Sequence, residues 1–404
     1  MGSKTQSYPH VKLTQPLEGK IALGHPWIYA DAVRHKHLSN LQPGDVVDVI
    51  GQDGAFVGRG VIDPDNPVRV RIWTLDASTQ VDDDLLARRI KMARRRRLYP
   101  DGATTGFRLL NGEGDRTPGL VCDIYGDVAV LRPDGRAAED RWLHPAREII
   151  DRMFPIKHWV IRRSAIHADK DRPVAQWWGE PRAEGNIVEF LEQGLRYECD
   201  VIEGQKTGFF LDMRANRARV GQLAAGKRVL NLFGYTGGFS LASAANGAAL
   251  TTTVDLAAPA VAQARRHFEL NGLYHPGHAF VVSDVFDYLE QFSEQSAPFE
   301  LAICDPPSFA HKRRDLERAS KAYIRLFGSL MKVMPTGSTL ALGSCSSHIH
   351  RDLFLELIAR AASEVSCQLV LTGVYGADHD HPFLPGFIEG DYLQCVLATL
   401  HRDD

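Results

Sequence analysis

Residues Val229–Ser240 read VLNLFGYTGGFS and predict an apolar strand, a glycine-rich turn and the start of a helix. At such a turn the backbone can approach a cofactor closely, because glycine has no side chain and a helix N-terminus presents free N–H groups. The glycine spacing is not G-x-G-x-x-G, which weakens a nicotinamide interpretation. The stretch therefore predicts a cofactor-binding turn of another kind.

Two acidic residues follow the next two expected strands. Asp255 ends the strand after the turn, in the place where nucleoside-binding folds hold the ribose hydroxyls with a carboxylate. Asp284 ends the third strand. The alternative is that either acid simply caps the end of its strand.

The sequence from about residue 204 onward alternates between β and α patterns. We expect strands at 228–233, 249–256, 279–283, 299–304 and 338–343, followed by β runs at 368–374 and 392–400. This order predicts the α/β fold class, with a doubly wound, mostly parallel, Rossmann-like sheet and a ligand crevice at the carboxyl ends of its strands.

Two further motifs stand at those strand ends. Asp305-Pro306-Pro307-Ser308-Phe309 follows the fourth strand, and its two prolines stiffen the loop so that Asp305 is aimed into the crevice. Cys345 leaves the fifth strand into a polar Ser-rich loop, whereas Cys304, Cys367 and Cys395 sit inside apolar strands and are expected to be packing residues. Cys345 is therefore the candidate nucleophile.

The preceding sequence predicts two smaller domains. We expect a small β domain over residues 1–75, a central α+β domain over 76–200, and the Rossmann-like domain over 201–404. An arginine-rich helix begins near Asp82 and ends before Pro100. The candidates for contacting RNA phosphates are Arg69, Arg71, Arg94, Arg95, Arg96 and Arg97. The alternative is that these arginines form solvated faces of a strand and a helix.

Composition indicates where the protein is located and what kinds of binding site it can have. The 404 residues hold 47 Lys and Arg against 50 Asp and Glu, a net charge of -3, so any RNA-binding surface must be local. Six scattered cysteines without a CxxC pair, no secretory signal and no membrane-length apolar run predict a cytoplasmic protein. We expect no metal site, because the His348/His350 and His379/His381 pairs lack further ligands.

Taken together, these residues resemble the large-subunit (23S) ribosomal RNA cytosine-5 methyltransferases that carry an N-terminal PUA domain. The resemblance covers nearly the whole chain and is strongest at residues 204–217, 231–239, 305–309 and 344–346. Two positions depart from the family pattern, since Gly234 and Gly343 stand where many members have cysteine.

The resemblance implies S-adenosylmethionine as cofactor and large-subunit ribosomal RNA as partner. Asp255 would take the ribose hydroxyls, Asp284 the adenine edge, and Asp305 would also lie at the cofactor. The residues implied for the rest of the cofactor are Gln205, Thr207, Phe209, Phe233, Gly234, Tyr235, Thr236 and Gly237. Oligomeric state is left open, with a homodimer as one option.

The implied chemistry uses Cys345 and Asp305 as catalytic residues. A Cys345 thiolate would add to C6 of cytosine and make C5 nucleophilic, while Asp305 would stabilise the adduct by a hydrogen bond at N3. The sequence names no base for removing the C5 proton. Two other functions stay open: a methyltransferase acting on a base amino group or a small molecule, and a non-catalytic RNA-binding assembly factor.

Overall fold

The computed structural model describes residues 8–34, 40–97, 99, 102–309 and 313–402. The chain forms two compact units. The first unit comprises Met1–Gly194, Glu198–Leu211 and His379–Gly390, and the second comprises Leu195–Tyr197, Asp212–Asp378 and Asp391–Asp404. The two smaller domains expected from the sequence thus belong to one unit, together with two segments from beyond the expected boundary at residue 200.

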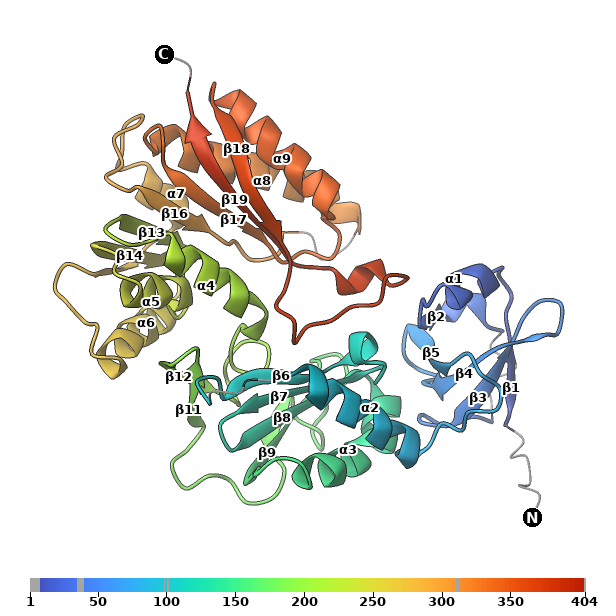
Figure 1. Ribbon diagram of the computed structural model, residues 1–404. Coiled ribbons are helices and arrows are strands. Elements are labelled where there is room, and N and C mark those ends of the chain that lie inside the picture. Colours follow the sequence, from blue (N-terminus) through green and yellow to red (C-terminus); the bar gives the residue numbers. More distant parts are fainter. Residues whose placement is uncertain (1–7, 35–39, 98, 100–101, 310–312, 403–404) are drawn as a thin grey trace. The chain divides into compact units, whose positions relative to one another are not determined.

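The N-terminal part of the first unit is a five-stranded sheet of order β1-β3-β4-β5-β2 (Figure 1). Its elements are β1 (His10–Lys12), α1 (Glu18–Ala22), β2 (Trp27–Tyr29), β3 (Val46–Ile50), β4 (Phe56–Ile62) and β5 (Val68–Thr74). Val47, Val49, Val70 and Ile72 alternate along their strands into one apolar core, as the period of two requires.

The central part of the first unit is a second five-stranded sheet, of order β10-β9-β8-β7-β6. Its helices and strands are α2 (Asp83–Arg96), β6 (Gly106–Asn111), β7 (Leu120–Tyr125), β8 (Val128–Pro133), α3 (Arg136–Asp151), β9 (His158–Arg162) and β10 (Ala175–Trp177). Helix α2 begins as expected, with the Asp82 carboxylate accepting the Leu85 N–H at 2.9 Å. The strands β11 (Ile187–Glu192) and β12 (Leu195–Asp200) follow.

The second unit contains a seven-stranded sheet of order β15-β14-β13-β16-β17-β19-β18. Its strands are β13 (Arg228–Leu232), β14 (Leu250–Asp255), β15 (Ala279–Val282), β16 (Leu301–Cys304), β17 (Thr339–Ser344), β18 (Gln368–Tyr375) and β19 (Gln394–His401). The first five are parallel and β19 runs antiparallel between β17 and β18. The expected α/β class is confirmed.

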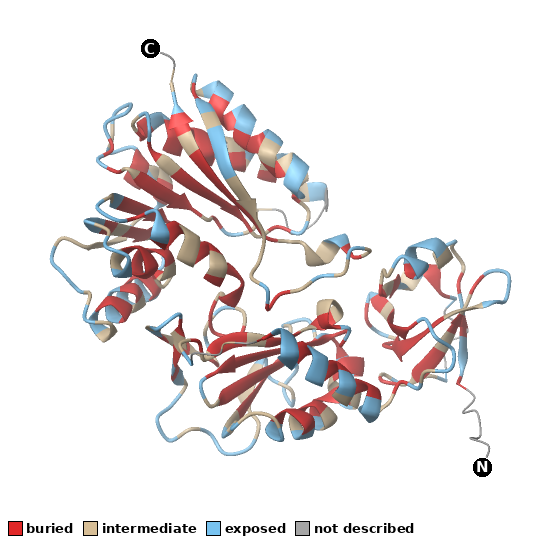
Figure 2. Ribbon diagram, viewed as in Figure 1, coloured by how far each residue is buried: buried red, intermediate tan, exposed pale blue. Residues whose placement is uncertain are grey.

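Helices cover both faces of this sheet, and β13, β16, β17 and β19 are buried along most of their length, whereas the edge strands β15 and β18 are not (Figure 2). The helices are α4 (Arg214–Gln222), α5 (Gly238–Ala245), α6 (Ala258–Leu270), α7 (Val285–Leu289), α8 (Leu316–Val333) and α9 (Arg351–Glu364). Alternate strand residues divide between the two faces: Leu340 and Leu342 pack with α8 and α9, whereas Ala341 packs in the core of α4 and α5. Strand order reverses at β13, and folds of this class bind their ligands beside such a reversal, at the carboxyl ends of the strands.

Candidate active site

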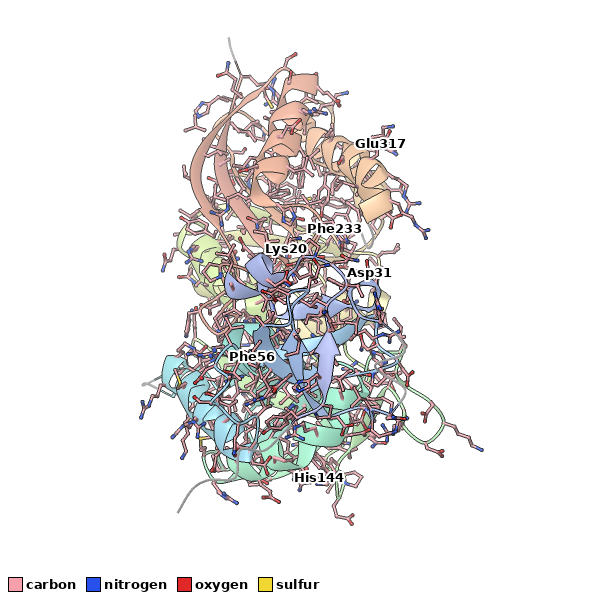
Figure 3. All side chains as sticks on the ribbon, turned by 90° about the vertical axis from the view of Figure 1, so that its right-hand side faces the viewer. Lys20, Asp31, Phe56, His144, Phe233 and Glu317 are labelled. Atoms are coloured by element: carbon pink, nitrogen blue, oxygen red, sulfur yellow. The ribbon has the colours of Figure 1, made fainter. Side chains whose placement is uncertain are left out.

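The turn after β13 has an unusual backbone. Phe233, labelled in Figure 3, and Tyr235 have φ angles of 54° and 46°, a region that residues with side chains rarely adopt. Gly237 has φ 75° and serves as the N-cap of α5. A β-carbon at Gly234 would lie 2.5 Å from Cγ2 of Thr253, so this position has no room for the cysteine common in the family. Strained backbone of this kind is often found at ligand sites.

Asp255 holds the turn to the end of β14. Its Oδ2 accepts the N–H of Tyr235 at 2.8 Å, and its Oδ1 accepts the N–H of Ala257 at 2.9 Å. A carboxylate can accept about four hydrogen bonds, so both oxygens keep capacity for further donors. The arrangement therefore fits the two hydroxyls of a ribose.

Asp284 is exposed and caps α7. Its Oδ1 accepts the N–H groups of Phe286 and Asp287 at 2.7 and 3.4 Å. The structure thus gives Asp284 the capping role considered as the alternative from the sequence. An additional contact with adenine stays a proposal.

Asp305 and the Cys345 loop are adjacent at the ends of two paired strands. β16 and β17 are in register with Cys304 opposite Leu342, so Asp305, the first residue after β16, lies beside Gly343 of β17. A β-carbon at Gly343 would lie 2.3 Å from Oδ1 of Asp305. Because Gly343 has no side chain, the Asp305 carboxylate can occupy this space.

Cys345 differs from the other cysteines in its surroundings. It is half-buried, whereas the other five are buried. Burial raises the pKa of the Cys304 thiol well above its usual value and that of Cys395 to about 12. These buried thiols are poor nucleophiles, because the thiolate is the reactive form.

Tyr323 on α8 contacts Phe309 of the Asp305 loop and Ser344, which precedes Cys345, and the sequence did not indicate it. Its hydroxyl lies 2.9 Å from Oγ of Ser344, and its ring lies edge-on to Phe309 with centroids 4.9 Å apart. Burial raises the pKa of Tyr323, as do the nearby groups of Cys345 and Asp305. A tyrosine in an apolar helix face carries no signal of such a role, so only the packing reveals it.

A buried hydroxyl network beneath the cofactor turn was also missed. Asn231 donates from Nδ2 to Oγ of Ser240 at 2.9 Å, and this hydroxyl lies 2.6 Å from Oγ1 of Thr253. The network ties β13, α5 and β14 together directly below Gly234. In the sequence, the polar Asn231 within an apolar strand was the available signal.

Three of the expected cofactor residues belong to the first unit. Thr207 is buried, and its hydroxyl lies 2.5 Å from Oδ2 of Asp123 and 2.9 Å from the hydroxyl of Tyr125. The Phe209 N–H donates to that same tyrosine hydroxyl at 3.2 Å. Gln205 is exposed. The Thr207 and Phe209 segment is thus anchored on the central sheet, and its contact with the cofactor stays a proposal.

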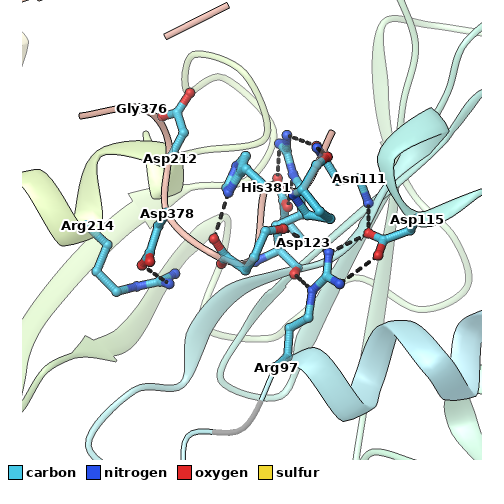
Figure 4. Close-up of polar contacts among 12 residues, drawn as sticks. Arg97, Asn111, Asp115, Asp123, Asp212, Arg214, Gly376, Asp378 and His381 are labelled. Atoms are coloured by element: carbon cyan, nitrogen blue, oxygen red, sulfur yellow. Dashed lines mark hydrogen bonds and ion pairs between the residues drawn. The ribbon is translucent and has the colours of Figure 1, made fainter. Parts of the chain in front are cut away.

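Two of the arginines expected at the RNA surface are buried, which corrects that part of the prediction. Arg71 forms ion pairs with Glu113 and Asp134, and Glu113 also accepts the indole N–H of Trp27 at 2.7 Å. Arg97 pairs with the fully buried Asp115 (Figure 4). Both guanidinium groups are used inside the first unit and offer nothing to RNA.

The remaining expected arginines lie nearer the surface. Arg94, Arg95 and Arg96 are exposed, and Arg69 is half-buried. Arg96 pairs with Asp115 at 2.5 Å, and Arg94 lies over the ring of Phe154 at 5.3 Å. Arg95 is therefore the member of the set best placed to meet a phosphate.

The described residues contain neither a cluster of metal ligands nor a membrane-spanning helix. In that part of the chain, no three His, Cys, Asp or Glu side chains are grouped as metal ligands would be. Among the same residues, no helix combines the length and apolar character that crossing a bilayer requires.

Comparison with known proteins identifies the family. The S-adenosylmethionine-dependent methyltransferase family matches residues 156–372, and a PUA-like domain matches residues 11–75. Proteins named ribosomal RNA large subunit methyltransferase are similar over nearly their full length. One from Deinococcus radiodurans is 36% identical, covering 99% of this chain and all of that protein. Another from Shewanella denitrificans, named ribosomal RNA large subunit methyltransferase I, is 34% identical. The match covers 96% of this chain and 99% of that protein.

Solved structures agree in fold. A S-adenosylmethionine-dependent methyltransferase from Streptococcus mutans superimposes with a TM-score of 0.81 at 23% identity, covering 96% of this chain and 99% of that one. A methyltransferase solved in complex with S-adenosylhomocysteine also gives a TM-score of 0.81 at 23% identity, covering 98% of this chain and 100% of that one. With its PUA-like domain and its matching methyltransferase region, the chain belongs to the S-adenosylmethionine-dependent methyltransferase family.

Proposed function

We propose that this protein forms 5-methylcytidine in large-subunit ribosomal RNA through a covalent adduct between Cys345 and C6 of the target cytosine. The observation that carries the proposal is the juxtaposition of Asp305 and Gly343, which brings the Asp305 loop against β17, the strand directly before Cys345. The names of the relatives supply the RNA class.

The chain's residues divide the chemistry between them. S-adenosylmethionine supplies an electrophilic methyl group bonded to a sulfonium. The Cys345 thiolate forms a bond to C6 of cytosine, which moves electron density to C5, and a protonated Asp305 carboxyl donates a hydrogen bond to N3, where negative charge develops. C5 then takes the methyl group. Loss of the C5 proton to a base expels Cys345 and restores the aromatic ring.

The turn and Asp255 support the cofactor assignment. Positive φ angles at Phe233 and Tyr235 turn the backbone sharply after β13, and the Asp255 oxygens keep capacity for two hydroxyl donors. We propose that this group binds the nucleoside part of the cofactor.

A cytosine analogue tests the mechanism. With 5-fluorocytosine in the RNA, fluorine occupies the position of the departing proton, elimination stalls, and the enzyme should stay bound to RNA on a denaturing gel. Cys345→Ala should form no adduct and no 5-methylcytidine, whereas Ser347→Ala, an exposed neighbour on the same loop, should behave as wild type.

Two outcomes would contradict the proposal. A Cys345→Ala enzyme that makes 5-methylcytidine at the wild-type rate would remove the covalent step and favour methylation of a base amino group. Unchanged 5-methylcytidine at every position of ribosomal RNA from cells lacking the protein would remove the substrate assignment.

A further inference from the structure

Helix α2 has two faces of opposite character. Leu86, Ile90 and Ala93 are buried in the core of the central domain. Arg88, Lys91 and Arg95 are exposed. At 3.6 residues per turn these three cations fall within a sector of about 60° on the side opposite the core. We call them the α2 cationic stripe.

The cations of the α2 cationic stripe form no ion pair with the residues that the structure describes, unlike other arginines of this helix, which bond to protein groups. Arg89 is buried and donates to the backbone carbonyls of Trp73 and Arg116, and Arg96 pairs with Asp115. Within the described part of the chain, no ion pair is formed by Arg88, Lys91 or Arg95. Asp84, one turn before Arg88, makes no ion pair with it either.

The local charge opposes the charge of the whole chain. Helix α2 holds six Lys and Arg and two Asp, while the protein carries a net charge of -3. Three unpaired cations on one exposed face keep their charge–charge repulsion without any ionic compensation. A ligand that brings closely spaced negative charges would relieve this repulsion.

We propose that the α2 cationic stripe binds the phosphate backbone of the RNA substrate. This inference rests on the proposed function, which makes RNA the substrate. Arg88 and Arg95 are about 10 Å apart along the helix axis, from a rise of 1.5 Å per residue. A nucleic-acid backbone carries about one charge per 3.4 Å of axis on each strand, so three phosphates lie within that span. These contacts set position and affinity, while base contacts elsewhere set specificity.

Neutralising the stripe should weaken RNA binding in a way that depends on salt. Arg88→Gln/Lys91→Gln/Arg95→Gln keeps good helix formers and removes three charges. The matched control, Arg132→Gln/Lys170→Gln/Lys332→Gln, removes three other exposed cations and so makes the same change in net charge. The probe is a fluorescently labelled RNA hairpin of about 30 nucleotides, titrated at several potassium chloride concentrations.

The stripe variant should bind roughly tenfold or more weakly at low salt. Its slope of log affinity against log salt should be shallower by about 2 to 3, because each lost phosphate contact removes about 0.7–0.9. The control should retain the wild-type slope. Equal losses in both variants would show a net-charge effect and overturn the proposal.

Two further readouts separate this proposal from its alternatives. Unchanged RNA binding, with loss of binding to phosphatidylglycerol vesicles, would reassign the stripe to a membrane surface. Formation of 5-methylcytidine is measured separately. If the wild type makes no 5-methylcytidine but its RNA binding depends on the α2 cationic stripe, the proposed function is wrong and the RNA-binding role of the stripe is supported. If the wild type makes 5-methylcytidine and the stripe variant binds RNA normally, only the RNA-binding role of the stripe is refuted.

Discussion

The carboxylate of Asp305 occupies the space that a side chain at Gly343 would need. A β-carbon at residue 343 would lie 2.3 Å from Oδ1, closer than non-bonded atoms tolerate. Gly343 itself takes no part in the reaction. A side chain added at this position should therefore affect catalysis by displacing Asp305.

Gly343→Ala should lower kcat by roughly tenfold or more, because small displacements of a positioned group are costly. Binding of S-adenosylhomocysteine and thermal stability should change less than kcat. The matched control is Gly328→Ala in α8, where the new carbon meets neighbours only at 3.7 Å. That control should keep activity and gain stability, since alanine favours helix. Full activity of Gly343→Ala would show that Asp305 need not stay in place.

Asp255→Ala should weaken S-adenosylhomocysteine binding more than tenfold in titration calorimetry. The change also removes the acceptor of the Tyr235 and Ala257 N–H groups, so the melting temperature should fall. Hydrogen bonds to a charged group contribute about 1.5–3 kcal/mol each. A lower melting temperature with unchanged affinity would leave Asp255 as a structural residue only.

Tyr323→Phe should lower kcat severalfold and leave cofactor affinity unchanged, because it removes the hydroxyl that contacts Ser344. The double variant with Ser344→Ala separates this link from a general packing effect. A coupling energy of about 0.5–1.5 kcal/mol between the two changes is expected. Additive effects on kcat would show that the two hydroxyls act independently.

The cysteines should differ sharply in reactivity. Of the six, only Cys345 is half-buried, and burial raises the pKa of Cys122, Cys199, Cys304, Cys367 and Cys395. A thiol reagent at neutral pH should thus label the native protein rapidly at one site, located by mass spectrometry of peptides. Cys345→Ser should abolish the rapid phase. Rapid labelling at another cysteine would contradict the assignment of burial.

Asp115→Asn should destabilise the first unit by about 3–5 kcal/mol, because it leaves the buried Arg97 without its counter-charge. Glu269→Gln breaks the exposed pair with Arg265 and should cost below about 1 kcal/mol. Denaturant unfolding measures both. Equal costs for the two variants would show that the Arg97 pair is not buried in solution.

Local sequence patterns predicted most of the sheet in the second unit. The expected ends of β13 to β17 agree with the structure within two residues, because apolar runs and turn residues mark strand ends directly. The acidic start of α2 was predicted equally well, whereas the helix ends at Arg96, three residues before the end expected at Tyr99. Asp255, Asp305 and Cys345 could be found because a parallel sheet collects such residues at one edge.

The positions of individual arginines were harder to predict. Helical periodicity places Arg97 on the same side as Ile90 and Ala93, but its partner Asp115 lies eighteen residues away without a local signal. Strand alternation separates Arg71 from Val70 and Ile72, yet it cannot show that the face of Arg71 meets Glu113 and Asp134. Long-range pairing decides both cases.

The loop His379–Gly390 completes a core that was otherwise built from the N-terminal half of the chain. Asp380 accepts Arg97 through its carbonyl at 2.8 Å and the Arg108 N–H through its carboxylate at 2.9 Å, and the Phe387 ring lies 4.5 Å from that of Trp27. During synthesis from the N-terminus, these partners emerge from the ribosome only after residues 212–378, which belong to the second unit, have been made. The native packing of the first unit therefore cannot close until residue 390 has been synthesised, and a fragment ending near residue 200 would lack part of its own interior.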